Sequence, residues 1–203
     1  MQVSALAYSI IRSTDPQQWV RFGEDVAGFS AHAVPGGHAL RIDERAGRMF
    51  IEKASEDRYF ASGWELRSRD QFEAGLAELD LKGVTWTRAT PAELALRHVF
   101  DMAWFNDPSG NRHEIFYGYQ TNFERFVSPV GVPRFVTGDL GYGHMVLPAP
   151  AFDATTGLLR DVLGFGVADI LVHRPMGEGG PEMRINFMHC ANGRHHSLAL
   201  FEG

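Results

Sequence analysis

The side chains best suited to chemistry lie in two stretches of the last third of the chain. His144 follows Gly141-Tyr142-Gly143 and opens a short apolar segment, and a second stretch holds His189 and the run Arg194-His195-His196. A neutral imidazole nitrogen binds divalent metals, and histidine also exchanges protons near neutral pH. These residues therefore indicate a metal centre or an acid–base site. The competing interpretations are a structural core histidine at 144 and a polar edge strand at 195–196.

Three other side chains are weaker candidates. Cys190 is interpreted as a small buried hydrophobe, because nothing in the sequence indicates a lowered thiol pKa. Ser197 lies beside histidines, but no nucleophile-elbow motif surrounds it, and the glycines form no dinucleotide or phosphate-loop fingerprint. Glu114 is a carboxylate in the first half of the chain, and we interpret it as structural.

The elements that must position these residues repeat one order: strand, helix, then strands. The first unit is predicted as a strand over 3–11, a helix from Asp15-Pro16 to Gly28, and paired strands over 38–41 and 48–52. The second unit is predicted as a strand over 61–67, a helix with a capping box at Asp70 and Glu73 that ends at Gly83, and strands over 99–105 and 113–119.

A third unit begins at Asp139 and resembles the first. Val162-Leu163-Gly164-Phe165 aligns with Val26-Ala27-Gly28-Phe29 at an offset of 136 residues (165 minus 29), which sets His144 against Tyr8. The sequence therefore predicts duplicated modules, each a strand, a helix and further strands.

The third unit is predicted to end in a β-hairpin. Asn192-Gly193 is a preferred two-residue turn, and it would pair Phe187 with Leu198 and His189 with His196. Directly opposed residues share a face, so Phe187, His189 and His196 would lie together. A one-residue bulge would exchange the two faces.

Composition limits the classes of function. The net charge of −6 and the lack of a basic run argue against a nucleic-acid partner. No apolar stretch approaches the ~20 residues of a membrane span, and the N-terminus lacks a signal-peptide pattern. A single cysteine fits a reducing compartment. We therefore expect a cytoplasmic protein with no membrane partner.

Several motifs together resemble the type I extradiol ring-cleavage dioxygenases, and above all their 2,3-dihydroxybiphenyl 1,2-dioxygenase and 1,2-dihydroxynaphthalene dioxygenase group. The motifs span nearly the whole chain and are Gly63-Trp64-Glu65, Asp107-Pro108-Ser109-Gly110-Asn111, Glu114-Ile115-Phe116-Tyr117-Gly118, the segment 136–144, Val162-Leu163-Gly164-Phe165, Phe187-Met188-His189-Cys190 and Arg194-His195-His196.

The resemblance implies an α+β fold of the vicinal oxygen chelate type, built from paired β-α-β-β-β modules. It implies a metal-free N-terminal domain over 1–125 with two modules and a C-terminal catalytic domain whose first module covers 138–203. The stretch 126–137, which contains Pro129 and Pro133, is the expected linker. About three of the family's four modules are then present.

The resemblance also implies roles for individual residues. His144 matches the first metal ligand, and His196 matches a catalytic acid–base outside the metal's ligand set. Val146, Phe187 and His189 are expected to line the pocket for substrate and dioxygen. The implied cofactor is Fe(II), occasionally Mn(II), and the implied reaction is meta cleavage of a bicyclic catechol such as 2,3-dihydroxybiphenyl in aromatic catabolism. The family likeness also implies a homo-oligomer.

The remaining histidine and glutamate ligands of the family are expected beyond Gly203, so we expect this chain alone to be inactive. Three explanations stay open from the sequence. The chain is a fragment of a dioxygenase, a second polypeptide supplies the last module, or the protein is a non-catalytic aromatic-binding or assembly protein of the same fold.

Overall fold

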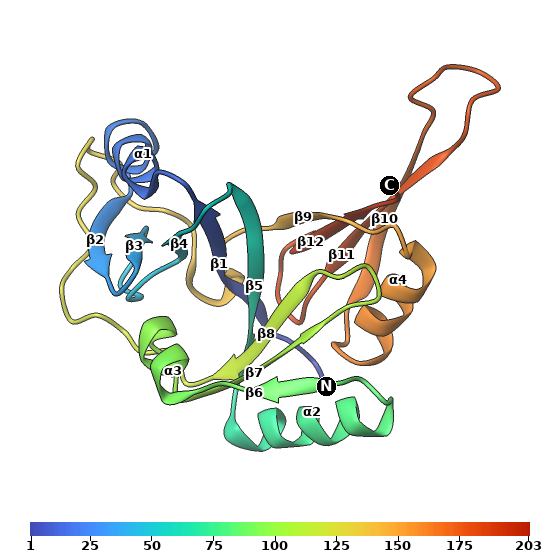
Figure 1. Cartoon of the computed structure of the whole chain (residues 1–203), viewed down its shortest axis with the longest axis horizontal. Coiled ribbons are helices and arrows are strands. Elements are labelled where there is room, and N and C mark those ends of the chain that lie inside the picture. The colour runs from blue at the N-terminus through green and yellow to red at the C-terminus, as the bar shows by residue number, and fades with distance from the viewer.

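Three modules with the order strand, helix and three strands follow one another along the chain, and the second has an additional short helix between its strands (Figure 1). A computed structural model describes all residues from Met1 to Gly203. The first module comprises β1 (Ala5–Ser13), α1 (Pro16–Phe22) with a π-helical turn (Gly23–Ala27), β2 (Ser30–Val34), β3 (Gly37–Arg41) and β4 (Met49–Lys53). The second comprises β5 (Arg58–Leu66), α2 (Arg69–Leu81), β6 (Trp86–Arg88), α3 (Pro91–Arg97), β7 (Asp101–Asn106) and β8 (Arg112–Tyr117). The third follows a 3-10 turn (Gly138–Leu140) and comprises β9 (Met145–Pro148), α4 (Phe152–Asp161), β10 (Gly166–His173), β11 (Met183–His189) and β12 (Leu198–Phe201).

The modules are assembled into two sheets. The first two modules share an eight-stranded sheet of order β2-β3-β4-β1-β5-β8-β7-β6, and the third forms a four-stranded sheet of order β10-β11-β12-β9. Within each module the first strand pairs parallel with the last, as β1 with β4, β5 with β8 and β9 with β12. The first two modules meet where β1 pairs antiparallel with β5. The predicted α+β fold of β-α-β-β-β modules is confirmed.

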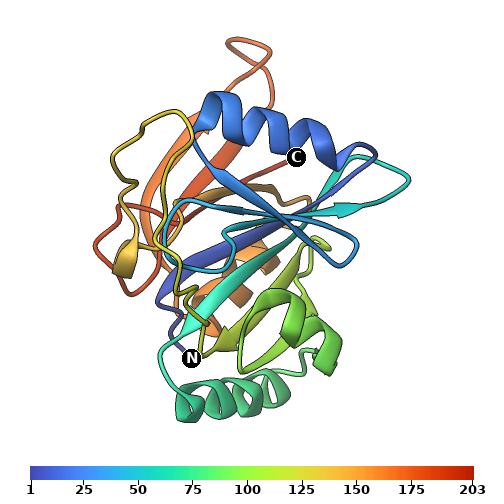
Figure 2. The same ribbon diagram turned by 90° about the vertical axis from the view of Figure 1, so that its left-hand side faces the viewer.

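One apolar core lies between the two sheets. It joins Leu6, Trp64 and Ile115 of the large sheet to Leu198 and Leu200 of the small one, together with residues of α2 and α4. The edge of the Trp64 ring lies against Phe165, with ring centroids 5.0 Å apart. The helix α1 instead contacts β3 and β4, and Figure 2 shows it on the opposite side of the molecule from α2. No helix is both long and apolar enough to cross a bilayer.

Local sequence patterns predicted some helix ends correctly and others wrongly. The Asp15 carboxylate accepts a hydrogen bond from the Gln17 amide, and Gly28 ends the first helical segment with φ +77°, as predicted. The predicted cap of α2 at Asp70 was wrong, because the hydroxyl of Ser68 accepts the Gln71 amide and starts the helix earlier.

The predicted register of the last hairpin was wrong by one residue. Phe187 pairs with Ala199, and Leu198 pairs with Met188 on the other face. The strands end at His189 and resume at Leu198, so Asn192-Gly193 lies in a wider connection and forms no two-residue turn. Asn192 is held by tertiary contacts instead, because its side-chain amide donates to the Ser4 carbonyl at 2.9 Å.

Candidate functional site

Two of the candidate histidines lie in contact on the open face of the small sheet. The rings of His144 and His196 have centroids 4.6 Å apart, and the Phe187 ring meets His196 edge-on at 5.0 Å. The Nδ1 atoms of His195 and His196 are 3.0 Å apart, so one of them donates to the other. His144 and His195 are exposed and His196 is half-buried.

Parallel strand pairing brings these histidines together. Leu198 at the start of β12 is the partner of Met145 at the start of β9, and the Met145 amide donates to the Ser197 carbonyl at 3.1 Å. The residues that precede two parallel neighbours lie at the same end of the sheet. His144 and His196 therefore meet although they are far apart in the sequence.

The other pocket candidates fall into one row across the sheet. Phe187 of β11 pairs with Ala199 of β12, which pairs with Val146 of β9, so these side chains share a face. Val146 is 51% exposed, whereas the small Ala199 between the two larger side chains is buried. His189 is exposed and lies over Gly166 on β10, and its Nδ1 lies 3.1 Å from the Cys190 carbonyl. It makes no ring contact with the histidine pair, contrary to the pairing with His196 that the predicted hairpin required.

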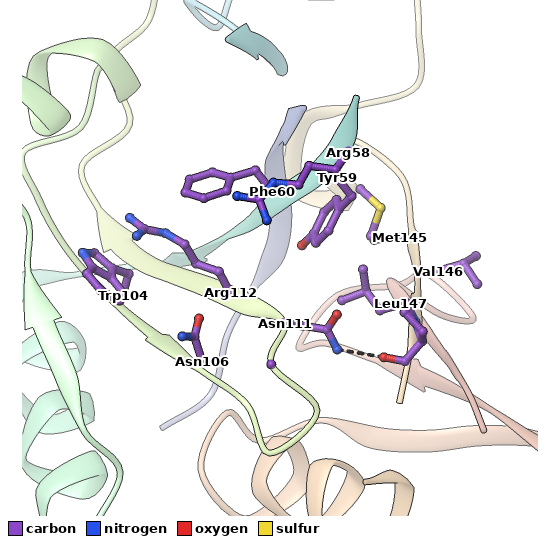
Figure 3. A pocket seen from close by; sticks show the side chains of 12 residues that line it. Arg58, Tyr59, Phe60, Trp104, Asn106, Asn111, Arg112, Met145, Val146 and Leu147 are labelled. Carbon is purple, nitrogen blue, oxygen red and sulfur yellow. Dashed lines mark hydrogen bonds between the residues drawn. The ribbon is translucent and has the colours of Figure 1, made fainter. Parts of the chain in front are cut away.

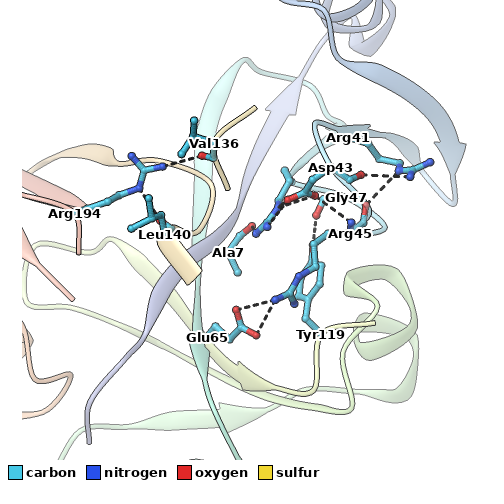
Figure 4. Close-up of polar contacts among 11 residues, drawn as sticks. Ala7, Arg41, Asp43, Arg45, Gly47, Glu65, Tyr119, Val136, Leu140 and Arg194 are labelled. Atoms are coloured by element: carbon cyan, nitrogen blue, oxygen red, sulfur yellow. Dashed lines mark hydrogen bonds and ion pairs between the residues drawn. The ribbon is translucent and has the colours of Figure 1, made fainter. Parts of the chain in front are cut away.

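Arg194, for which the sequence predicted no separate role, anchors the connection that carries His196. Figure 4 shows its guanidinium reaching the segment that leads to His144. Nε donates to the Leu140 carbonyl at 2.6 Å and Nη2 to the Val136 carbonyl at 3.2 Å. Next to this segment, the Tyr142 amide donates to the Leu6 carbonyl of β1 at 2.8 Å. The only feature of the sequence that could have indicated this role is the arginine itself, whose long cationic side chain can donate to backbone carbonyls.

The electrostatic surroundings favour a neutral His196. Burial, followed by the neighbouring His144, His195 and Arg194, lowers the pKa of His196 from its ordinary value. A neutral imidazole accepts a proton, which a protonated one cannot. In contrast, burial raises the pKa of the Cys190 thiol to about 12, in agreement with its interpretation as a small hydrophobe.

The residues present do not fit a metal ion as a complete ligand set. His144 and His196 offer imidazole nitrogens, but no group of three His, Cys, Asp or Glu side chains is arranged to hold an ion. A facial triad requires two histidines and a carboxylate around one point. The resemblance set out above implies a ligand position for His144 alone among these residues.

The equivalent position in the first two modules is closed by a buried network. Tyr8, Gly63 and Glu114 lie in one row across β1, β5 and β8. The Tyr8 hydroxyl donates to Glu114 at 2.8 Å, and Arg97 Nε and Arg112 Nε donate to the same carboxylate at 3.3 and 3.0 Å. Glu114 is fully buried and its oxygens are satisfied, which agrees with a structural role.

A separate cavity borders the edge of β9. It measures about 600 Å³ and lies between β5, the β7–β8 hairpin and β9 (Figure 3). Arg112 stacks over Trp104 on its wall, with 4.0 Å from the guanidinium carbon to the ring centroid, and is already ion-paired with Glu114. Val146 borders this cavity, whereas His144, His196 and Phe187 do not.

Comparisons with known proteins agree with this architecture. The family described as "Dihydroxybiphenyl dioxygenase BphC D1" matches residues 6–53. An iron-dependent extradiol dioxygenase of Rhodococcus jostii (strain RHA1) is 37% identical over 98% of this chain and 68% of its own length. A biphenyl-2,3-diol 1,2-dioxygenase of Pseudomonas sp. (strain KKS102) is 33% identical, with the same coverage of both chains.

A solved structure shares the fold closely. The crystal structure of BphC, a halotolerant catechol dioxygenase, superposes with a TM-score of 0.88 and is 29% identical to this chain. The match covers 99% of this chain and 65% of that one. The chain spans about two thirds of the length of the relatives it matches.

Proposed function

The chain belongs to the extradiol ring-cleavage dioxygenases, which are oxidoreductases of the vicinal oxygen chelate fold, and from that membership we propose its reaction. The proposed substrate is a bicyclic catechol such as 2,3-dihydroxybiphenyl. One ring carbon–carbon bond next to the hydroxyl groups breaks, and both atoms of dioxygen enter the product. The catechol is oxidised and dioxygen is reduced, so the reaction balances without another reductant.

The contact between His144, His196 and Phe187 is the observation that carries the proposal. The Nδ1 atom of His196 is occupied by His195, which leaves Nε2 for proton exchange with a substrate. The Phe187 ring beside it forms an aromatic wall against which a second ring packs. His196 is therefore the proposed acid–base residue, and it accepts a catechol proton and later returns it.

Val146 and His189 are proposed as further pocket residues. Val146 lies in the same row as Phe187 and presents an exposed apolar surface suited to a small apolar molecule such as dioxygen. His189, two residues after Phe187 on β11 and over Gly166, would border the outer part of the pocket.

The proposed cofactor is iron as Fe(II), with Mn(II) as the alternative. Support comes from the relative described as iron-dependent. A bound divalent ion lowers the pKa of a hydroxyl that coordinates it. His144 would contribute one imidazole, and the ion needs donors that these residues do not group together. We also propose a cytoplasmic location, which the single buried free thiol of Cys190 supports.

Turnover by the full-length gene product tests this proposal, because the residues of this chain alone do not group enough donors to hold the ion. The protein is purified without oxygen, incubated with Fe(II) and given 2,3-dihydroxybiphenyl or catechol in air-saturated buffer. We expect a yellow ring-fission product, formed faster from the bicyclic substrate. Faster turnover of catechol would contradict the bicyclic preference alone. Iron that is bound without any turnover would contradict the activity itself.

A further inference from the structure

Strand β10 is an open sheet edge that carries exposed apolar side chains. The order β10-β11-β12-β9 places it at the end of the small sheet. Ile170, Leu171 and Val172 are 57%, 49% and 49% exposed. Figure 1 shows the loop between β10 and β11 projecting away from the rest of the molecule. An open apolar edge of this kind is a template for pairing with another strand.

The backbone groups of Ile170 and Val172 face this open edge. In β11 the Met188 carbonyl accepts from the Ser197 amide at 2.8 Å, and the Arg184 carbonyl accepts from Glu202 at 2.9 Å. The backbone amides and carbonyls of the even-numbered residues of β11 therefore point toward β12 and away from β10. Ile170 pairs with Asn186 and Val172 with Arg184, so both pairs are non-hydrogen-bonded. The free amides and carbonyls of β10 are those of Ile170 and Val172.

The segment from Asp169 to His173 is complementary to itself in the antiparallel direction. If Leu171 lies opposite Leu171 of a second copy, Ile170 lies opposite Val172 and Asp169 opposite His173. Carboxylate–imidazole and apolar cross-strand pairs both stabilise antiparallel strands. The Ile170–Val172 pairs are also the ones whose backbone groups face outward, so they form the hydrogen-bonded pairs of this register.

From this match we propose that β10 pairs with β10 of a second copy of the chain about a twofold axis at Leu171. Such an interface is isologous and closes at two copies. It uses the edge farthest from β9, and it does not depend on the function proposed above.

Asp169 changes its hydrogen-bond partner when the two strands pair. In the single chain its Oδ1 accepts the Ile170 amide at 2.8 Å and so covers the free donor of the edge. In the pair, the Val172 carbonyl of the second copy accepts this amide. The carboxylate is then free for the opposing His173.

Disulfide trapping tests the pairing at its axis. In a non-hydrogen-bonded antiparallel pair the Cα atoms are about 4.5 Å apart, which lies within the disulfide range. We expect Leu171→Cys to give a covalent dimer under mild oxidation, seen on non-reducing gels. Unmodified protein should not cross-link, because its only cysteine, Cys190, is buried.

Two cysteine variants on the same sheet serve as matched controls. Ile170→Cys faces Val172 of the second copy and is too far from itself to bridge, and Val146→Cys reports association through β9. A cross-link at either position in place of Leu171→Cys would overturn the proposed register or surface, and no cross-link at all would show that this edge does not pair. In the Leu171→Cys background, Asp169→Lys should remove the cross-link and adding His173→Asp should restore it.

Discussion

His196 is the single residue on which the proposed chemistry depends most. Its ring touches both His144 and Phe187, and it has no part in a buried hydrogen-bond network. We expect His196→Gln to lower the turnover rate by about 10²–10⁴-fold, the usual effect of losing a general acid–base group. Iron content, measured by plasma mass spectrometry, should stay within the range of the unmodified protein.

His144→Ala is the matched comparison for this variant. Because His144 is the proposed ligand, its loss should lower iron content together with turnover. A His196 variant that loses iron as severely as the His144 variant would contradict the division of roles between them.

A second residue-scale feature is the buried group formed by Trp64, His113 and Asp107. The Trp64 indole, which is only a donor, donates to His113 Nδ1 at 3.0 Å. The proton of His113 therefore lies on Nε2, 3.1 Å from the Asp107 carboxylate. Burial alone would raise the pKa of Asp107, but hydrogen bonds from His113 and Asn111 outweigh it and lower that pKa from its ordinary value.

Because the pKa of Asp107 is lowered in the folded protein, the free energy of unfolding decreases as the pH falls. The contribution of Asp107 is complete above about pH 5 and is lost as pH falls through the folded-state pKa. Asp107→Asn should lower the free energy of unfolding by about 1–3 kcal/mol at pH 7 and flatten its fall between about pH 5 and 2. Urea unfolding across this pH range measures both effects. The exposed Asp70→Asn should change neither, and an unaltered acid slope in Asp107→Asn would refute the assignment.

At the scale of elements, the turn after β7 holds the third module in place. Ala151 at the start of α4 has no side-chain cap of its own, and its amide donates instead to Ser109 Oγ at 3.1 Å. The same hydroxyl lies 2.7 Å from Thr155 Oγ1, and Asn111 donates to the Pro148 carbonyl of β9 at 2.9 Å. A loop of the second module thus caps the helix and fixes the strand that follows His144.

Removing this cap should destabilise the fold measurably. Ser109→Ala is expected to cost about 1 kcal/mol, the usual value of a helix cap. A double-mutant cycle with Thr155→Val should show coupling, because the two hydroxyls touch. Chemical denaturation supplies the four stabilities, and Ser55→Ala on the exposed surface is the control. Strict additivity of the two substitutions would show that the contact contributes nothing.

Sequence patterns located most elements but not those that depend on distant contacts. The Asp15-Pro16 start of α1 and the Gly28 stop are local signals, and both were confirmed. The α3 helix was missed although it has a complete capping box of Thr90 and Glu93, because it is only seven residues long and lies in the connection between two paired strands, β6 and β7. The hairpin register failed since Asn192 is used by a contact to Ser4, far away in the sequence.

At the scale of the whole molecule, three similar modules have different interiors. In the first two modules, three neighbouring strands meet in the row of Tyr8, Gly63 and Glu114. The interior at this row is filled by the buried carboxylate of Glu114 and by Arg97, which donates to it. The repeat offset of 136 residues, which sets His144 against Tyr8, predicted this correspondence from the sequence. The guanidinium that fills the first interior was not predictable, because Arg97 lies on the missed α3 helix.

The fate of the two oxygen atoms distinguishes extradiol ring cleavage from other reactions of a catechol. The iron-loaded full-length gene product is given 2,3-dihydroxybiphenyl under ¹⁸O₂, and the product is analysed at once by mass spectrometry. Extradiol cleavage predicts a ring-opened product that carries both labelled atoms. A product with one labelled atom or none, or unchanged substrate in the presence of bound iron, would contradict the account.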